Sequence, residues 1–292
     1  MDYLRGNATA NASGIYVICR YVSRVEDGMP EADLKSSLSV LRAMDETTAE
    51  QGSALLDSSL TVARDIGLLN RVEKSSRLVV DSTLAEGLSA GGTWSWFRGE
   101  LLDRMVRHAL DSVENGGKVP DLILGLMWFL QLSPLMPPFL DWNAGPYTLV
   151  RRYAMQDVIS TGEQWRAFQR WAVALGLARR CDQPNARVLI PDASTAVSDQ
   201  LDKLPTTATA RDWHIALLRL LPILGEANLT DRLPTASGGW SNLPPGLVLG
   251  LLKLERQGVL KLEPSDDSSD VVAIGLGSLV RQIGRVSRGG QQ

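Results

Sequence analysis

The sequence has little net charge and few cysteines, and both shortages exclude classes of function. Lys and Arg number 30 against 33 Asp and Glu, which gives a formal net charge of -3. No overall field therefore draws the molecule to nucleic acid or to an anionic membrane, and any such contact has to be a local patch. The two cysteines, Cys19 and Cys181, are far apart, which excludes a disulfide framework and a cysteine-based metal site.

Long apolar runs are also missing. The first residues, 1–14, are mostly polar and contain no apolar stretch of the kind that a secretory signal needs, so a cytoplasmic protein is predicted. The longest apolar run, residues 122–132, is shorter than the ~20 residues that cross a bilayer, and Pro134 follows it. This run predicts a core helix and no membrane contact.

No catalytic constellation can be assembled from the sequence. The two histidines, His108 and His214, have no cysteine or carboxylate at metal-ligand spacing, which predicts surface or helix-cap roles. The segment Gly116-Gly117-Lys118 lacks the Ser or Thr that follows the lysine of a phosphate loop, and it predicts a turn between helices. Pro191-Asp192 lacks the second half of a nuclease motif and predicts a turn after a strand. We therefore expect no enzyme activity, no metal and no cofactor.

What the sequence does contain is a pattern that occurs three times. Each copy has apolar residues at helical spacing, then a glycine, then an apolar run that follows a polar turn. A glycine just past a helix end is typical of a left-handed residue that stops the helix, and the later run predicts a two-stranded hairpin. The three copies have helices over residues 54–66, 165–175 and 247–254, stops at Gly67, Gly176 and Gly258, and returning strands at residues 78–80, 188–190 and 271–274.

A helix that leads directly into a hairpin is the second half of a winged helix. The first half is predicted for the first copy by helices over residues 15–25 and 34–44, and for the third copy by helices over residues 213–224 and 229–233. Residues 94–160 are predicted to be helical throughout, with breaks at 115–117 and at the prolines of 134–146.

The predicted fold is mainly α with short β-hairpins, in which tandem winged-helix-like units flank a helical middle region. The predicted domains are a winged-helix-like domain over residues 1–90, a helical region with a second winged-helix-like unit over 91–200, and a winged-helix-like domain over 201–292. Five tryptophans could stack on bases. The helical spacing of Trp165, Phe168 and Trp171 predicts core packing instead.

Contact with duplex DNA is the leading functional prediction, because a helix-turn-helix unit places its recognition helix in a groove and its flanking segments on the backbone. Hydroxyl and basic side chains of the third helix and hairpin are the candidates in each unit. In the first unit these are Ser58, Ser59, Thr61, Arg64, Arg71, Lys74 and Arg77. In the second unit they are Arg166, Arg170, Arg179, Arg180 and Arg187.

The third unit is predicted to contact protein. Its hairpin turn carries Asp266, Asp267 and Asp270, and these carboxylates would repel phosphate. The segment that follows, residues 281–288, is basic and is predicted to be a solvated terminus.

The layout of these segments resembles the DpdG proteins, which belong to gene clusters that place 7-deazapurine bases in DNA and restrict DNA lacking them. The resemblance rests on the first helix, the end of the third helix, the mid-chain helix, its strand end, and a C-terminal winged unit. The first four of these segments are residues 15–25, 63–69, 168–177 and 189–192. The resemblance implies a non-catalytic accessory component of a bacterial DNA-modification or anti-phage defence system. This component would work beside helicase, ATPase and nuclease subunits. The resemblance supplies no catalytic residue that could be assigned in this sequence.

The predicted function is therefore an adaptor that contacts duplex DNA weakly and holds partner subunits. Two alternatives stay open at this point. One is a pure protein-interaction scaffold without DNA contact, and the other is a winged-helix transcriptional regulator that binds an operator as a dimer.

Overall fold

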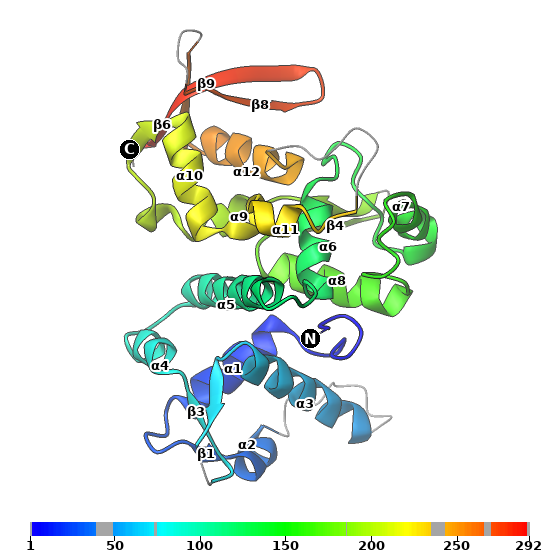
Figure 1. The fold of residues 1–292 in the computed structure, drawn as a ribbon, viewed down its shortest axis with the longest axis vertical. Coiled ribbons are helices and arrows are strands. Elements are labelled where there is room, and N and C mark those ends of the chain that lie inside the picture. Colours follow the sequence, from blue (N-terminus) through cyan, green and yellow to red (C-terminus); the bar gives the residue numbers. More distant parts are fainter. Residues whose placement is uncertain are drawn as a thin grey trace.

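The computed structural model describes residues 2–38, 49–72, 75–184, 186–234, 243–265 and 270–290. About 51% of the residues are helical and 17% lie in strands, so the fold is mixed α/β. The strands form three separate small sheets, one in each predicted unit. Figure 1 shows helix α5 between the N-terminal elements on one side and the C-terminal elements on the other. The buried apolar residues of all three parts belong to one continuous core.

Among the described residues before position 82, the first unit has three helices and a three-stranded antiparallel sheet with the order β1-β3-β2. Asn11 begins the first helix, because its side chain accepts a hydrogen bond from the Gly14 amide at 2.6 Å. Gly67 ends the third helix with φ +69°, as the sequence predicted. The elements are α1 (Ala12–Val22), β1 (Met29–Pro30), α2 (Glu31–Ser37), α3 (Ala49–Asp65), β2 (Leu69–Arg71) and β3 (Arg77–Val80). The second half of the predicted helix 34–44 lies outside the described residues.

The middle region is interrupted at the prolines, as predicted: residues 131–141 are not helical, because Pro134, Pro137 and Pro138 remove backbone donors. Residues 153–161 are not helical either, which corrects the prediction of helix for that segment. Helix α6 is buried on all sides, which confirms the predicted core helix. In the part of the chain that the structure describes, no helix has the length and apolarity to cross a membrane. The elements are α4 (Ser82–Ser89), α5 (Trp94–Glu114), α6 (Asp121–Leu130), η2 (Trp142–Ala144) and α7 (Pro146–Arg152).

The second unit is a helix followed by a two-stranded hairpin. Gly176 stops the helix with φ +74°, and the hairpin pairs from Ala178 with Pro191 to Gln183 with Ala186. The rings of Trp165 and Phe168 stack at 5.3 Å in the core, which confirms the predicted packing role of this aromatic stripe. The elements are α8 (Gly162–Ala174), β4 (Ala178–Gln183), β5 (Ala186–Pro191), α9 (Ser194–Ser198) and η3 (Leu201–Lys203).

The third unit differs from its prediction in the sheet. The two strands expected to form its hairpin, β7 and β8, do not pair with each other, and both pair with β9, as does β6. The basic segment 281–288 is therefore a central strand and not a solvated terminus, because Ile283 and Val286 on it are buried in the core. The elements are β6 (Thr207–Thr209), α10 (Ala210–Leu220), η4 (Pro222–Leu224), α11 (Ala227–Thr230), α12 (Pro245–Arg256), β7 (Leu260–Pro264), β8 (Val272–Leu276) and β9 (Leu279–Arg288).

Candidate nucleic-acid interface

The three candidate hydroxyls of the first unit lie on α3 in different surroundings. Ser58 accepts a hydrogen bond from the Thr9 hydroxyl at 2.8 Å, and the Thr61 hydroxyl donates to the Asp57 carbonyl at 2.9 Å. Ser59 is fully buried on the side of α3 that packs on α1, so it cannot reach a duplex. The expectation for Ser59 is corrected here: the helical period that buries Leu56, Leu60 and Ala63 buries Ser59 as well. Lys74 lies outside the described residues.

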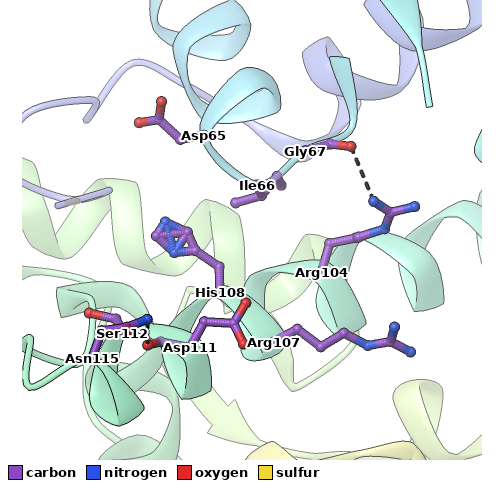
Figure 2. A pocket seen from close by; sticks show the side chains of 9 residues that line it. All are labelled: Asp65, Ile66, Gly67, Arg104, Arg107, His108, Asp111, Ser112 and Asn115. Carbon is purple, nitrogen blue, oxygen red and sulfur yellow. Dashed lines mark hydrogen bonds between the residues drawn. The ribbon is translucent and has the colours of Figure 1, made fainter. Parts of the chain in front are cut away.

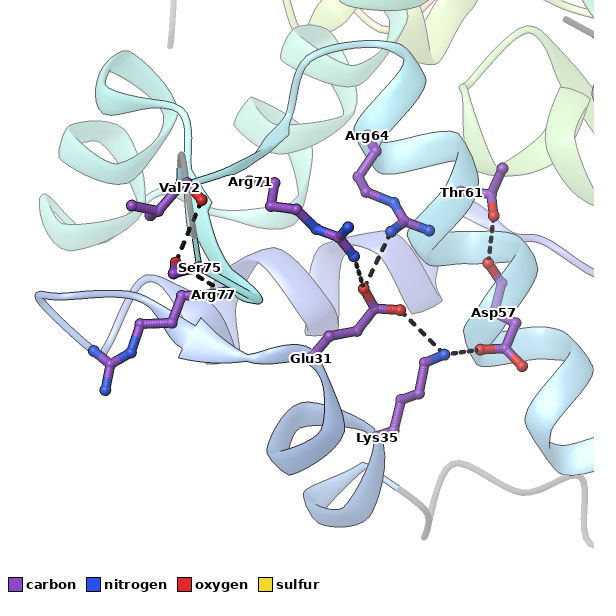
Figure 3. A network of polar contacts seen from close by, with 9 residues as sticks. All are labelled: Glu31, Lys35, Asp57, Thr61, Arg64, Arg71, Val72, Ser75 and Arg77. Carbon is purple, nitrogen blue, oxygen red and sulfur yellow. Dashed lines mark hydrogen bonds and ion pairs between the residues drawn. The ribbon is translucent and has the colours of Figure 1, made fainter.

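A carboxylate that was not predicted from the sequence partly compensates the basic charge of the first unit. Figure 3 shows Glu31, at the start of α2, reached by three cations from three elements. Arg64 Nη1 lies 3.2 Å, Arg71 Nη2 2.9 Å and Lys35 Nζ 3.1 Å from its oxygens. Partial burial opposes the shift, but hydrogen bonds from Lys35 and Arg71 hold the pKa of Glu31 below its ordinary value.

The remaining charges around this network are also satisfied. Lys35 forms a second ion pair with Asp57 at 2.7 Å, and Arg77 donates to the Asp27 carbonyl at 3.2 Å. The structure therefore brings Arg64 and Arg71 together. Both side chains contact the carboxylate of Glu31 and are not surrounded by solvent alone. The pairing of Glu31 with Arg64 and Arg71 has no signal in the sequence, because these partners lie 33 and 40 positions further along the chain. The spacing of Glu31 and Lys35, four positions on one helix, was the one signal that could have indicated a pair.

In the second unit, the hairpin register sorts the arginines onto two faces. Asp182 lies opposite Arg187, and Arg180 is two residues before Asp182 on the same strand, so these three side chains share one face. Asp182 accepts from Arg180 at 2.7 Å and from Arg187 at 2.8 Å, and these two hydrogen bonds lower its pKa. Arg179 points to the other face and has no hydrogen-bond or ion-pair partner in the described part of the chain.

The two candidate arginines of α8 also differ from each other. Arg170 donates to the Ala8 carbonyl at 2.7 Å, and burial, followed by the charge of Arg166, lowers its pKa. Arg170 therefore joins α8 to the N-terminal segment and has a structural role. Arg166 is exposed and, over the residues described, has no partner. Arg166 and Arg179 are the candidates of this unit whose charges the protein itself leaves unpaired.

The acidic turn of the third unit lies largely outside the described residues, which include Asp270 but neither Asp266 nor Asp267. Asp270 lies 3.8 Å from Arg211 on α10. The basic residues of β9 have acidic neighbours, because Arg281 reaches Glu255 on α12 and Arg288 lies 3.4 Å from Asp202.

A pocket between the end of α3 and helix α5 contains one of the two histidines (Figure 2). Arg104 closes one side of it by donating to the Gly67 carbonyl at 3.1 Å and to Asp81 at 2.5 Å. His108 and His214 are half-buried in the interiors of α5 and α10, which corrects the predicted surface or cap roles, and burial lowers the pKa of both. Across the described ranges, no group of three side chains is arranged to hold a metal ion.

A second cleft contains two ion pairs that the sequence reading also missed. Asp192 follows β5 and accepts from the Ser194 amide at 2.9 Å, which confirms the predicted turn after a strand. Its other oxygen forms an ion pair with Lys253 of α12, 61 positions away in the chain. In the same cleft, Arg98 of α5 binds Asp199 through Nε at 2.6 Å and Nη2 at 2.9 Å.

Comparison with known proteins gives one match. A family model described as DpdG-like matches residues 4–268, which is most of the chain. The matched range begins before α1 and ends between β7 and β8, so it includes the helix and the glycine stop of each of the three units. No curated protein and no solved structure matches the chain.

Proposed function

Because the chain belongs to the DpdG-like family, we propose that it is a non-catalytic adaptor of a bacterial DNA-modification or anti-phage defence complex. The family suggests a role in the dpd 7-deazaguanine modification system. In this role the protein contacts duplex DNA weakly and holds partner subunits, such as a helicase, an ATPase or a nuclease, near the duplex.

The element order of the first unit supports a winged-helix assignment. A short strand separates the first two helices, the third helix leads into a hairpin, and the sheet order is β1-β3-β2. This arrangement presents one helix and one hairpin on the same side, as DNA-binding helix-turn-helix proteins do. The second unit supplies only the last helix and the hairpin.

The observation that carries the proposal is the unpaired charge on the second unit. Arg166 and Arg179 are exposed, and none of the described residues pairs with either. Arg180 and Arg187 lie on the same hairpin and share a single carboxylate, so the hairpin has an excess of positive charge. The first unit contributes less because Arg64 and Arg71 are both held against Glu31, which compensates part of their charge and supports weak contact.

Charge reversal on the hairpin tests this proposal. We expect the double substitution Arg179→Glu and Arg180→Glu to weaken binding to a labelled duplex by about tenfold or more at low salt, and to reduce the slope of affinity against salt concentration. The melting temperature should change little, because both side chains are exposed and the Arg180–Asp182 ion pair lies at the surface, where such pairs contribute little stability. The matched control is Arg219→Glu, an exposed arginine on α10, which should bind as the wild type does.

A protein-interaction scaffold is the second candidate, and an exposed apolar loop favours it. Leu135 and Met136, between α6 and α7, are 63% and 81% exposed. Apolar side chains of this size at the surface are typical of contact with another protein. Wild-type protein without salt-dependent duplex binding would support the scaffold, whereas strong preference for one DNA sequence would support a transcriptional regulator.

A further inference from the structure

A cleft of about 590 Å³ lies where hairpin β4–β5, the short helix α9, helix α12 and the start of α5 meet. Its charged lining is mainly basic. The basic side chains are Arg98, Arg179, Arg180 and Lys253, and the acidic ones are Asp192 and Asp199. The cleft therefore has an excess of positive charge in a protein whose total charge is slightly negative.

Each of the two carboxylates forms an ion pair with one lining cation, Asp199 with Arg98 and Asp192 with Lys253. The excess of positive charge therefore comes mainly from Arg179, because Arg180 also pairs with Asp182. The side chains of Arg98 and Asp199 are 13% and 9% exposed, and those of Lys253 and Asp192 are 27% and 3% exposed. Each carboxylate is largely removed from solvent, so separating it from its cation would leave an uncompensated charge. Both acids are therefore neutralised, and they do not repel an anion that enters the cleft.

Several hydrogen-bond donors of the cleft remain without an acceptor. Arg98 binds Asp199 through Nε and Nη2, which leaves Nη1 unused among the described contacts. The Lys253 ammonium has three protons, and its described contacts are Asp192 and the Ser194 hydroxyl, the latter at 2.9 Å. The whole guanidinium of Arg179 and the exposed hydroxyls of Thr195 and Ser198 line the same space.

We propose that this cleft binds a phosphate group, with Arg179 closing on it from the hairpin and Lys253 and Arg98 holding it from the floor. Convergent charged donors without acceptors are what a phosphate oxygen requires. No aromatic side chain is among the lining residues, so the cleft offers no surface on which a base could stack. Recognition is therefore directed at the phosphate and not at the base.

This inference goes beyond the proposed function, because it holds whether the phosphate belongs to a nucleic acid or to a free nucleotide. It also gives Arg179 a different role from that of Arg180, whose charge is shared with Asp182 on the opposite face of the hairpin.

The test uses the full-length protein and isothermal titration with inorganic pyrophosphate. We expect saturable binding to the wild type and a loss of about tenfold or more in affinity for Arg179→Ala, because one charged phosphate contact is removed. Thr195→Asp, which adds a carboxylate at the exposed edge of the cleft, should abolish binding. The control Arg219→Ala should bind as the wild type does, and melting temperatures report that each variant is folded.

Competition then identifies the source of the phosphate. Displacement of pyrophosphate by a short duplex assigns a nucleic-acid phosphate, and displacement by deoxyguanosine monophosphate alone assigns a free nucleotide. Pyrophosphate binding without any duplex binding supports the cleft and contradicts the DNA contact. Duplex binding that Thr195→Asp does not alter, by a protein that does not bind pyrophosphate, supports the DNA contact and overturns the cleft. The absence of pyrophosphate binding, or equal binding by wild type and both cleft variants, also overturns it.

Discussion

At the scale of single residues, Asp121 joins the N-terminal segment to helix α6. Its buried carboxylate accepts hydrogen bonds from three successive amides, those of Tyr3, Leu4 and Arg5, at 2.7, 3.0 and 3.1 Å. A fourth bond comes from the Leu122 amide at 2.7 Å. A buried acceptor that serves several donors is costly to remove, because the donors are left without partners away from water.

We expect Asp121→Asn to lower the free energy of unfolding by about 1–3 kcal/mol, since the amide keeps one acceptor oxygen and loses the other. Urea denaturation measures the change. Asp141→Asn is the matched control. Among the described contacts, the exposed Asp141 side chain accepts a hydrogen bond from the Asn143 amide alone, so the substitution should change stability by less than about 1 kcal/mol. Equal effects of the two substitutions would contradict the anchoring role of Asp121.

At the scale of elements, the Glu31 network joins α2, α3 and β2 (Figure 3). Since the pKa of Glu31 is lower in the folded protein than its ordinary value of about 4.3, the network stabilises the fold above that pH. The stabilisation is lost as the pH falls through the lowered pKa. The free energy of unfolding should therefore decrease below about pH 4, and Glu31 should account for part of the decrease.

Glu31→Gln should lower the melting temperature at pH 7 and make it less dependent on acid, because the amide has no charge to lose. Melting temperatures at pH 7 and pH 3.5 measure both effects. Glu114→Gln, at the exposed end of α5 and without a partner in the described chain, is the control and should match the wild type. If the melting temperature of Glu31→Gln decreased between pH 7 and pH 3.5 as much as that of the wild type, other carboxylates would be responsible for the loss of stability in acid.

At the scale of the whole molecule, strand β9 holds the C-terminal sheet together. Strands β6, β7 and β8 pair with β9 and not with one another. Removal of residues 277–292 would therefore leave three strands with unpaired backbone groups and expose the core side of α10 and α12. If the segment were a solvated terminus, as its basic composition predicts, its removal would leave the hydrogen-exchange protection of the other strands unchanged.

We expect this truncation to abolish protection of β6 and β7 in hydrogen exchange, while the helices of the first unit keep their protection. Removal of residues 291–292 alone leaves β9 intact and is the control. Full protection in the longer truncation would contradict the central position of β9.

Elements that depend on neighbouring residues could be predicted from the sequence alone. The stops at Gly67, Gly176 and Gly258 all have φ between +69° and +74°, since only the local backbone decides whether a left-handed residue ends a helix. The aromatic stripe of α8 was predictable for the same reason, because helical period alone places Trp165 and Trp171 on one face.

Only the tertiary structure decided which charges are paired and which strands are neighbours. Glu31 meets Arg71 across 40 positions, Lys253 meets Asp192 across 61, and Arg98 meets Asp199 across 101. The energy of a charge pair depends on distance in space, and sequence separation says nothing about that distance. The position of strand β9 also depends on contacts between distant parts of the chain. Its partners β6 and β7 are placed by the packing of α10 and α12, and the composition of β9 does not determine them.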